Sequence, residues 1–415
     1  MLSTLVVGSG GREHAIVRAL SHSKSIQKLY VHPGSSGILK ECESLGLSAK
    51  ASINEIVEKV KALDLDMVVV GPEQPLVEGL SDALRQQGVL VVGPSSEGAK
   101  LEGDKVYAKE FMKEFNVPSG GYIPLKTKAD LLEALENPTY QNPYVFKYRY
   151  LAGGKGVLVS NDKNEVLEFS KKYLDDQSVQ AYLEEPLRGW ELSCICLVSE
   201  AGYEICPILQ DHKRLKDGDE GPNTGGMGVA GPLQVEPELM KSIVKDVVET
   251  SVRGLKEREI LFRGVLYIGV MVTEDGPQVL EYNVRFGDPE AQLIFPLVES
   301  DWGEVLHKLS KGEAFDLESS NQYASCVVLA AEGYPDSPKK GAKIIGLSDI
   351  DSKDFYHAGT LLDEDSNFIV NGGRVLNVLG FGDSLKEALD KTYENVKKVS
   401  FDGMQSRSDI GAKLS

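Results

Sequence analysis

The sequence has few cysteines, no long hydrophobic run and no surplus of positive charge. Five of its 415 residues are cysteines and none forms a Cys-x-x-Cys pair, which fits reduced thiols better than a disulfide framework or a zinc site. No window reaches the roughly 18 unbroken apolar residues that a membrane helix needs. The net charge of -18 argues against nucleic-acid or anionic-membrane ligands, because both require a basic surface. We therefore expect a cytoplasmic protein that binds neither nucleic acid nor membranes.

The N-terminal part of the chain, residues 1–103, has the pattern of a parallel α/β domain. Four apolar runs, LSTLVVG, KLYVHPG, DMVVVGPE and VLVVGPS, alternate with segments of helical periodicity such as EHAIVRALSHS. This alternation is typical of βαβ units around a parallel sheet. Each run ends in glycine or proline, so short loops are expected at the carboxyl edge of the sheet, where ligands of such sheets bind.

The rest of the chain divides into a long middle part and a short C-terminal part. Residues 104–320 mix helices with longer strands and contain two glycine-rich loops. Residues 321–415 alternate short strands, among them YASCVVLAA, KIIGL, FYHAGTLL and RVLNVLGFG, and continue into the helical segment SLKEALDKTYENVKKVS. The last part is therefore predicted to be a small α+β domain.

The first glycine-rich loop does not support a dinucleotide-dependent oxidoreductase. Counting from Gly8, the fingerprint G-x-G-x-x-G finds Gly10 but then Glu13 in place of the third glycine, and the second strand ends without an acidic residue for a ribose hydroxyl. Two interpretations of the loop remain. Backbone N–H groups of Gly10 and Gly11 at a helix start, with Arg12 beside them, suit a phosphate monoester, or the loop is a tight turn with a surface arginine.

The segment EYNVRFGDPE carries the strongest signal for chemistry. Strand alternation places Glu281, Asn283 and Arg285 on one face and turns Tyr282, Val284 and Phe286 into the core. A carboxylate and an amide oxygen two residues apart suit Mg²⁺, and an arginine two residues further on can neutralise a phosphoryl or carboxylate oxygen. The alternative is an ordinary polar strand face.

Other cations and loops fit the same purpose, although each is a weak signal alone. Lys105 at a predicted helix start and Lys147 late in a predicted strand can meet phosphates, as can the loop LAGGKG, but most lysines are merely solvated. The segment QDHKR is followed by a second glycine-rich loop, GPNTGGMG, that can close on a ligand.

Taken together, these motifs resemble one family closely. GSGGREHA, VGPEQPLVEG, LAGGKGV, QDHKR, GPNTGGMG, NVRFGDPE, FYHAGT, NGGRVL and RSDIG are similar to the motifs of the phosphoribosylamine–glycine ligase family, or glycinamide ribonucleotide synthetases, of the ATP-grasp superfamily. The resemblance runs from Gly8 to Gly411. It implies an N-terminal substrate-binding domain in residues 1–103, an ATP-grasp domain in 104–320 with a mobile lid at about 123–190, and a C-terminal α+β domain in 321–415.

The resemblance implies that glycine and 5-phosphoribosylamine are joined with ATP, through a glycyl phosphate, in purine biosynthesis. Glu281 and Asn283 would bind Mg²⁺ or Mn²⁺, and the catalytic residues would be Arg285, Asp211 and Lys213. The implied ATP-binding residues are Lys105, Lys147, Gly153, Gly154, Lys155, Gly156, Glu184, Glu185, Leu187 and Glu191. The implied substrate-binding residues are Gly10, Gly11, Arg12, Glu13, Pro72, Glu73, Asn223, Thr224, Gly225, Gly226, Met227 and Asp288. A monomer with transient contacts to neighbouring purine-pathway enzymes is expected.

The chain departs from the family pattern beside the proposed nucleotide site. Where the family usually reads K-A-D-G-L-A-A-G-K-G-V, this chain has Arg149 in place of aspartate and Tyr150 in place of glycine. Asp104 also replaces a serine before Lys105, and Ala230-Gly231 replaces a common Tyr-Ser pair. Two alternatives to an active enzyme of this family therefore stay open: a degenerate ATP-grasp protein that binds nucleotide without turnover, and another carboxylate–amine or carboxylate–ammonia ligase.

Overall fold

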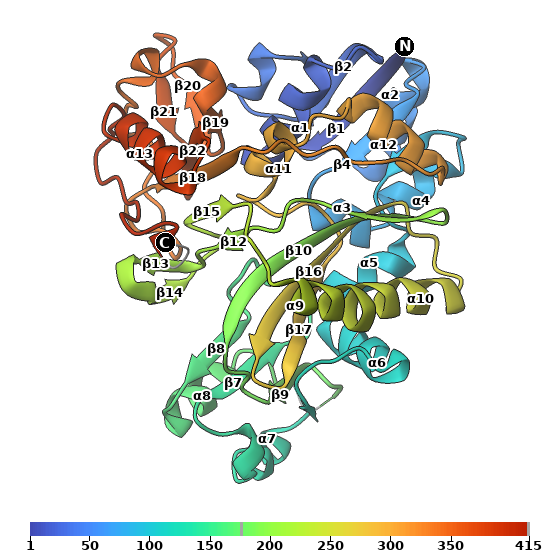
Figure 1. The fold of residues 1–415 in the computed structure, drawn as a ribbon, viewed down its shortest axis with the longest axis vertical. Helices are drawn as coiled ribbons and strands as arrows, with labels where there is room; N and C mark the ends of the chain where they lie inside the picture. Colours follow the sequence, from blue (N-terminus) through green and yellow to red (C-terminus); the bar gives the residue numbers. More distant parts are fainter. Residues whose placement is uncertain (175–176, 413–415) are drawn as a thin grey trace.

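The computed structural model describes residues 1–174 and 177–412. Residues 175–176 of the expected lid and 413–415 of the expected C-terminal domain lie outside this description. Figure 1 shows the N-terminal sheet and the C-terminal sheet side by side, with the central sheet below them. A separate lobe, formed by residues 122–174 and 177–184, also lies below them.

The N-terminal sheet is parallel, as predicted, with the order β3-β2-β1-β4-β5. Its strands are β1 (Leu2–Gly8), β2 (Ile26–Pro33), β3 (Glu43–Ser44), β4 (Met67–Val70) and β5 (Leu90–Val92). Its helices are α1 (Gly11–Ser21), α2 (Ile53–Ala62), α3 (Glu73–Val77) and α4 (Leu80–Arg85), and a short 3-10 helix, η1, spans Ile38–Lys40. The strands form because their apolar runs are buried on both faces.

Two helices from the middle of the chain also cover the N-terminal sheet. They are α11 (Ala291–Leu297) and α12 (Trp302–Lys311), which contact α1 and, for α12, β5. Trp302 and Phe295 are buried in one apolar cluster with Val6 and Val69 of the sheet. The chain therefore returns to its first domain after forming the central sheet.

The lobe contains an antiparallel sheet with the order β6-β9-β7-β8. Its elements are β6 (Tyr122–Leu125), α7 (Lys128–Ala134), η2 (Pro138–Tyr140), β7 (Tyr144–Tyr148), β8 (Val157–Ser160), α8 (Lys163–Ser170) and β9 (Ala181–Glu184). Two helices lead to it, α5 (Ser96–Gly103) and α6 (Lys105–Phe115). Phe146 and Leu183 belong to a small core of the lobe's own.

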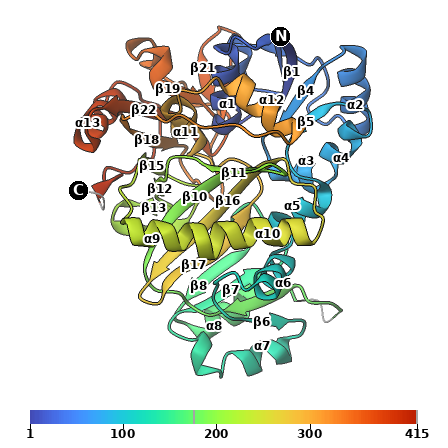
Figure 2. The same ribbon diagram turned by 45° about the vertical axis from the view of Figure 1, so that its right-hand side comes forward.

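The central sheet is antiparallel, in the order β11-β10-β16-β17. Its strands are β10 (Trp190–Ser199), β11 (Gly202–Ile205), β16 (Gly264–Thr273) and β17 (Gly276–Asn283). Three consecutive helical segments, α9 (Pro237–Ser242), η4 (Ile243–Glu249) and α10 (Thr250–Glu257), lie across it (Figure 2). Cys194 and Cys196 are buried in this sheet.

The C-terminal sheet includes strands from the middle of the chain. Its order is β12-β15-β18-β22-β19, formed by β12 (Gln210–Asp211), β15 (Gly228–Gly231), β18 (Tyr323–Ala330), β22 (Arg374–Gly382) and β19 (Phe355–His357). Nearby lie the hairpins β13 (Arg214–Lys216) with β14 (Glu220–Asn223) and β20 (Thr360–Leu362) with β21 (Phe368–Val370), together with α13 (Leu385–Val396) and the 3-10 helices η3 (Asp217–Asp219), η5 (Leu347–Asp349) and η6 (Ser352–Asp354).

Two strand predictions in this part are wrong. KIIGL forms only isolated bridges at Lys343 and Ile345 and no strand. FYHAGTLL divides between β19 and β20, which belong to different sheets.

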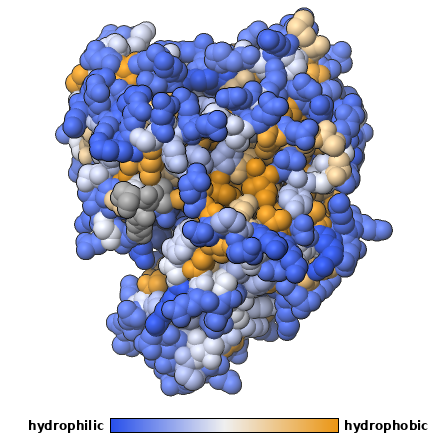
Figure 3. All heavy atoms as spheres, viewed as in Figure 1, coloured by the Kyte–Doolittle hydropathy of each residue, from blue (hydrophilic) through white to orange (hydrophobic). Residues whose placement is uncertain are grey.

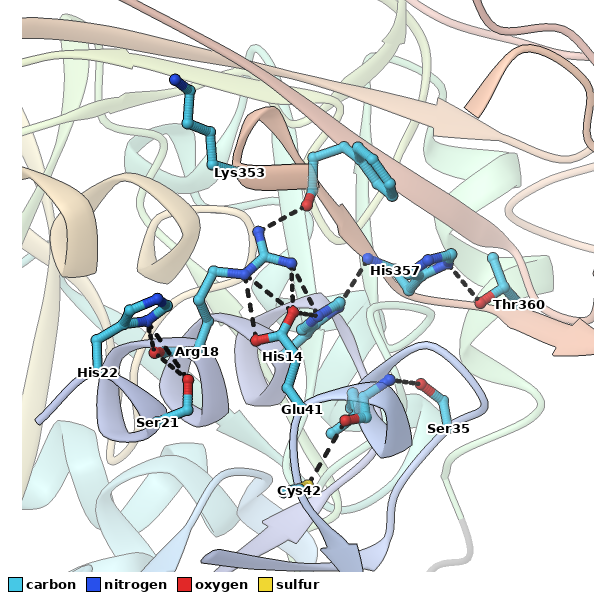
Figure 4. Close-up of polar contacts among 12 residues, drawn as sticks. His14, Arg18, Ser21, His22, Ser35, Glu41, Cys42, Lys353, His357 and Thr360 are labelled. Carbon is cyan, nitrogen blue, oxygen red and sulfur yellow. Dashed lines mark hydrogen bonds and ion pairs between the residues drawn. The ribbon is translucent and has the colours of Figure 1, made fainter. Parts of the chain in front are cut away.

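A polar network joins α1 to the C-terminal sheet (Figure 4). Glu41 accepts hydrogen bonds from His14 Nε2 at 2.9 Å and from Arg18 Nη2 at 2.6 Å. His14 Nδ1 accepts the backbone N–H of His357 at 2.9 Å, so the proton of the neutral ring is on Nε2. The network therefore links α1 to β19 of the C-terminal sheet.

The Glu41→Gln variant is expected to lose about 2 kcal/mol of stability at pH 7. Burial alone would raise the pKa of Glu41, but His14 and Arg18 lower it to about 2. A carboxyl group with a lowered pKa stabilises the fold above its unfolded-state pKa and loses this contribution as the pH falls. Urea denaturation should therefore show a difference from the parent protein that is full above pH 4.5 and disappears toward pH 2. Glu43→Gln, on the exposed strand β3, is the matched control and should not differ; a pH-independent difference for Glu41→Gln would contradict the assignment.

The surface is largely hydrophilic, as the many charged residues of the sequence lead us to expect. Figure 3 shows hydrophilic side chains over most of one face and an indentation between the lobe and the part of the molecule above it. Within residues 1–174 and 177–412, none of the helices combines the length and the apolar character needed to cross a bilayer.

Candidate active site

A cavity of about 570 Å³ lies where the N-terminal loops, the central sheet, the lobe and the C-terminal sheet meet. This volume is in the usual range for a small-molecule site. The predicted residues that line it are Arg12, Pro72, Glu73, Lys105, Gly153, Gly154, Gly156, Asp211, Lys213, Thr224, Gly225, Glu281, Asn283, Arg285 and Asp288. The predicted residues outside this lining are Gly10, Gly11, Glu13, Lys147, Lys155, Glu184, Glu185, Leu187, Glu191, Asn223, Gly226 and Met227.

Strand β17 presents the central polar row of the cavity. Glu281 and Asn283 line it, followed by Arg285 just beyond the strand. Tyr282 and Val284 are buried in the core on the other side. The alternation predicted from EYNVRFGDPE is therefore confirmed in the structure.

The Glu281 carboxylate is surrounded by cations. Burial would raise its pKa, but Lys213, Lys147, Lys105 and Arg285 lower the pKa to about 2. Lys213 Nζ lies 3.7 Å from Glu281 Oε1 and 3.4 Å from Glu191 Oε2. Glu281 is thus ionised at neutral pH, and Lys213 links it to Glu191 at the edge of the site.

Arg285 is fixed by two carboxylates that come from distant segments. Its Nη2 donates to Glu102 Oε1 and to Asn283 Oδ1, each at 2.9 Å, and Glu73 Oε2 lies 3.5 Å from Nε. Glu102, on α5, also accepts the backbone N–H of Val284 at 2.8 Å. The sequence alone does not indicate Glu102, because a single buried glutamate on a helix has no motif around it.

Three lysines lie on the side of the cavity that faces the lobe. Lys105 and Lys109 line it, and Lys147 lies behind them on β7. Glu184 forms ion pairs of 2.5 Å with both Lys109 and Lys147. Burial opposes ionisation of Glu184, but the two lysines outweigh it and lower its pKa. The Glu184 carboxylate holds the two lysines, and its predicted place beside a nucleotide stays a prediction.

The glycine loop between β7 and β8 closes one end of the cavity. Gly153 and Gly154 have φ values of +56° and +80°, which favour glycine, and both line the cavity. Lys155 points elsewhere, with Nζ 3.5 Å from the carbonyl oxygen of Asp336. Glu185 is also displaced from the lining, because its Oε2 accepts the backbone N–H of Gly121 at 3.0 Å.

A second carboxylate group lies deeper in the cavity. Asp211 on β12 and Glu290 both line it, and Glu290 Oε1 accepts hydrogen bonds from Tyr267 at 2.8 Å and Ser193 at 3.0 Å. Burial, followed by the nearby charge of Glu290, raises the pKa of Asp211 well above its usual range. Lys213 has its pKa raised despite burial, because Glu191 and Tyr267 favour its charged form. The roles of Glu290 and Tyr267 were not predicted from the sequence.

The GPNTGGMG loop contributes only part of its length to the cavity. Thr224 and Gly225 line it, whereas Met227 is fully buried behind them. Gly226 has a φ of +112°, and a side chain there would meet Pro289. The loop is therefore shaped by its contact with the GDPE turn.

At the start of α1, carboxylates of the protein accept two of the backbone N–H groups. The Gly10 N–H donates to Glu13 Oε2 at 2.6 Å, and the Arg12 N–H donates to Asp288 Oδ2 at 3.3 Å. Glu13 thus takes the Gly10 N–H, and the prediction that Gly10 and Gly11 hold a phosphate stays a prediction. Arg12 itself lines the cavity and is not a surface arginine.

The C-terminal sheet supplies a further cation to the cavity. Arg374, from the NGGRVL motif, lines the cavity. Its Nη1 lies 3.3 Å from Asp288 Oδ1 and donates to the carbonyl oxygen of Gly225 at 2.7 Å. Tyr334 lines it as well and accepts the N–H of Gly225 at 3.1 Å. The motif was noticed in the sequence, but nothing there indicated that Arg374 reaches the site.

The donors around Glu281 fit a hard divalent cation that a ligand helps to bind. Among the residues that the structure describes, no three His, Cys, Asp or Glu side chains form a complete metal site. An ionised carboxylate and an amide oxygen are the usual protein share of a Mg²⁺ site, where phosphate oxygens and water complete the coordination. The cavity can therefore hold a polyphosphate with its metal, together with a second anion near Arg285.

Family comparisons cover nearly the whole chain. Residues 2–102 match the model of the phosphoribosylglycinamide synthetase N domain, residues 103–291 that of its ATP-grasp (A) domain, and residues 324–413 that of its C domain.

Individual relatives give the same result. The chain is 38% identical over 423 residues to a phosphoribosylamine–glycine ligase of Caldanaerobacter subterraneus, covering 99% of this chain and 100% of that one. It is 37% identical to the trifunctional purine biosynthetic protein adenosine-3 of Chironomus tentans, with 99% of this chain and 31% of that protein covered. The crystal structure of a phosphoribosylamine–glycine ligase from Thermotoga maritima superposes with a TM-score of 0.84 at 34% identity, covering 99% of this chain and 100% of that chain.

Proposed function

Because the chain belongs to the phosphoribosylglycinamide synthetase family, we propose that it joins glycine to 5-phosphoribosylamine with ATP, forming glycinamide ribonucleotide, ADP and phosphate in purine biosynthesis. The observation that carries this proposal is the row of Glu281, Asn283 and Arg285 on one wall of a cavity lined with cations. Such a wall suits a reaction in which the protein mainly positions and neutralises phosphoryl charge.

The first step activates glycine. Its carboxylate is a poor electrophile, so an oxygen of it attacks the γ-phosphorus of ATP, ADP leaves, and glycyl phosphate forms. Lys105 and the backbone of Gly153 and Gly154 neutralise and cover the phosphates, while Arg285 stabilises the transferred phosphoryl group. Lys147 and Lys109, held by Glu184, add positive charge behind Lys105.

The second step forms the amide. The amine of 5-phosphoribosylamine attacks the carbonyl carbon of glycyl phosphate, phosphate leaves, and one proton is released. Asp211, a carboxylate that lines the cavity, accepts this proton, and Lys213 stabilises the oxyanion. Arg12 and Arg374 lie on the side of the cavity nearest the N-terminal loops and bind the ribose phosphate.

Glu281 and Asn283 would hold Mg²⁺ or Mn²⁺, which supplies charge neutralisation at the phosphates when bound. The family's use of ATP and the donor chemistry of this pair support this assignment.

An inactive nucleotide-binding protein is the second candidate. The departures at Tyr150 and Arg149 favour it, whereas the presence of Lys105, Glu281, Asn283 and Arg285 in one cavity favours turnover. We infer a cytoplasmic monomer with transient contacts to other purine-pathway enzymes. The fused relative supports these contacts.

A coupled assay of ADP release tests the proposed function. ADP should form only when glycine and freshly generated 5-phosphoribosylamine are both present, and mass spectrometry should detect the amide product. ADP release that needs neither substrate would identify an ATPase, and nucleotide binding without any ADP release would leave only a nucleotide-binding protein. Release that needs a different carboxylate or amine would identify another ligase of the superfamily.

The Arg12→Ala variant is expected to raise the KM for 5-phosphoribosylamine about tenfold and to leave the KM for glycine nearly unchanged. The reason is the loss of one cation from the proposed ribose-phosphate site. Because Arg12 also donates to Glu13 at 2.6 Å and to the Phe286 carbonyl at 3.2 Å, the melting temperature must be measured in parallel. The reverse pattern of KM values in a folded variant would move the ribose phosphate elsewhere.

A further inference from the structure

Two positions at which the chain departs from its family contact each other. Arg149 donates to Asp104 twice, from Nε to Oδ1 at 2.8 Å and from Nη2 to Oδ2 at 2.6 Å. The side chains are 25% and 16% exposed, so the pair is mostly shielded from water. A two-point contact between charged groups is the strong form of an ion pair. Neither residue lines the cavity, so the positive charge of Arg149 is directed at Asp104 and not at the nucleotide site.

Asp104 has a second structural role at the same place. Its Oδ1 accepts the backbone N–H groups of Val106 and Tyr107, each at 3.1 Å, and thereby caps the start of α6. Arg149 follows β7, and its Nη1 donates to the carbonyl oxygen of Val179 at 3.1 Å. One carboxylate thus joins the first turn of α6 to the end of β7 in the lobe.

Lys105 lies between these two connections and lines the cavity. Its backbone N–H donates to the carbonyl oxygen of Arg149 at 2.8 Å. Its Nζ lies 3.2 Å from the carbonyl oxygen of Tyr150. The glycine loop begins at the next residue, Leu151. The position of the Lys105 ammonium group and the start of the loop therefore depend on the same short segment.

We propose that Asp104 and Arg149 form a positioning pair, which fastens Lys105 to the start of the glycine loop and so sets the affinity of the cavity for nucleotide phosphates. Neither residue touches the nucleotide; both act through Lys105 and the loop. The pair accounts for two departures at once, since each charge is the partner of the other. The inference rests on the proposed use of ATP in this cavity.

A charge-reversal series tests the pair. Arg149→Asp places two carboxylates against each other and should raise the dissociation constant of ADP about tenfold, with kcat changed less than about threefold. The double variant Asp104→Ser with Arg149→Asp removes the repulsion while serine keeps a helix cap, and should return ADP binding to within about threefold of the parent. Arg149→Lys keeps the charge but loses the two-point contact, so an intermediate value is expected.

Lys163→Asp is the matched control, because Lys163 pairs with Glu136 elsewhere on the lobe. This reversal should leave ADP binding unchanged. Calorimetric titration with ADP and MgCl₂ measures all variants, with melting temperatures to confirm folding and with KM for ATP as a second readout. Equal losses in the single and double variants, or no loss in Arg149→Asp, would overturn the inference.

The titration separates this inference from the proposed ligase function. ADP binding needs neither glycine nor 5-phosphoribosylamine, so a parent protein that binds ADP but fails the coupled assay refutes the ligation and still tests the pair. A parent protein that ligates normally, with variants that bind ADP alike, refutes the pair alone.

Discussion

Replacing Glu281 with glutamine is expected to lower kcat roughly a thousandfold, equivalent to roughly 4 kcal/mol of transition-state stabilisation. The substitution keeps the size of the side chain but removes the only carboxylate in the β17 row. With a pKa of about 2, Glu281 is ionised at neutral pH, so its charge is available there for a metal ion. Turnover should be measured against MgCl₂ concentration, and the variant should need more metal to reach its own maximum.

Glu274→Gln is the control for this experiment. Glu274 lies exposed in the turn between β16 and β17, so the same chemical change at the far end of the hairpin should leave kcat and the metal requirement as they are. Near-normal turnover of Glu281→Gln at all magnesium concentrations would refute the metal assignment and not merely weaken it.

Replacing Arg285 with lysine is expected to lower kcat at least about a hundredfold while the KM for ATP changes little. Lysine keeps the positive charge, but one ammonium group cannot replace three nitrogens, of which Nη2 contacts Glu102 and Asn283, Nη1 the Phe286 carbonyl and Nε Glu73. The charge would then be misplaced in the transition state, where phosphoryl charge develops, more than in the bound ground state.

Arg263→Lys provides the comparison for this variant. Arg263 also donates to a carboxylate, Glu200, and to the carbonyl oxygen of Ser310, but it lies outside the cavity. It should retain full turnover. A rise in KM for ATP with unchanged kcat in Arg285→Lys would show that Arg285 binds ATP equally in ground and transition states and has no special role in phosphoryl transfer.

The sequence predicted the parts of the site that local periodicity determines. Alternation along β17 alone places Glu281 and Asn283 together and turns Tyr282 away, because successive side chains of a strand point to opposite faces. The parallel N-terminal sheet was likewise readable, since buried parallel strands are short apolar runs separated by helices. Motif resemblance added the loops, which carry no periodicity of their own.

The residues that hold these groups in place were not readable in the same way. Glu102 reaches Arg285 across 183 positions of the chain, and Arg374 reaches Gly225 across 149. Such contacts arise only when distant elements of the fold pack together, so no local sequence pattern predicts them. The helix start at Gly10 shows the opposite case: the motif is typical of an anion site, but Glu13 of the protein itself takes the N–H group.

The class of domains, the β17 row and the family to which the chain belongs can all be predicted from short-range patterns or from motifs in a constant order. The pairing of the charges follows only from the packing of the folded chain. Arg149 and Asp104 are two unfavourable departures when considered one at a time, and they become an ion pair of 2.6 Å because β7 ends beside the start of α6. A charge acts through space, so its effect cannot be assigned until the fold has placed its partner.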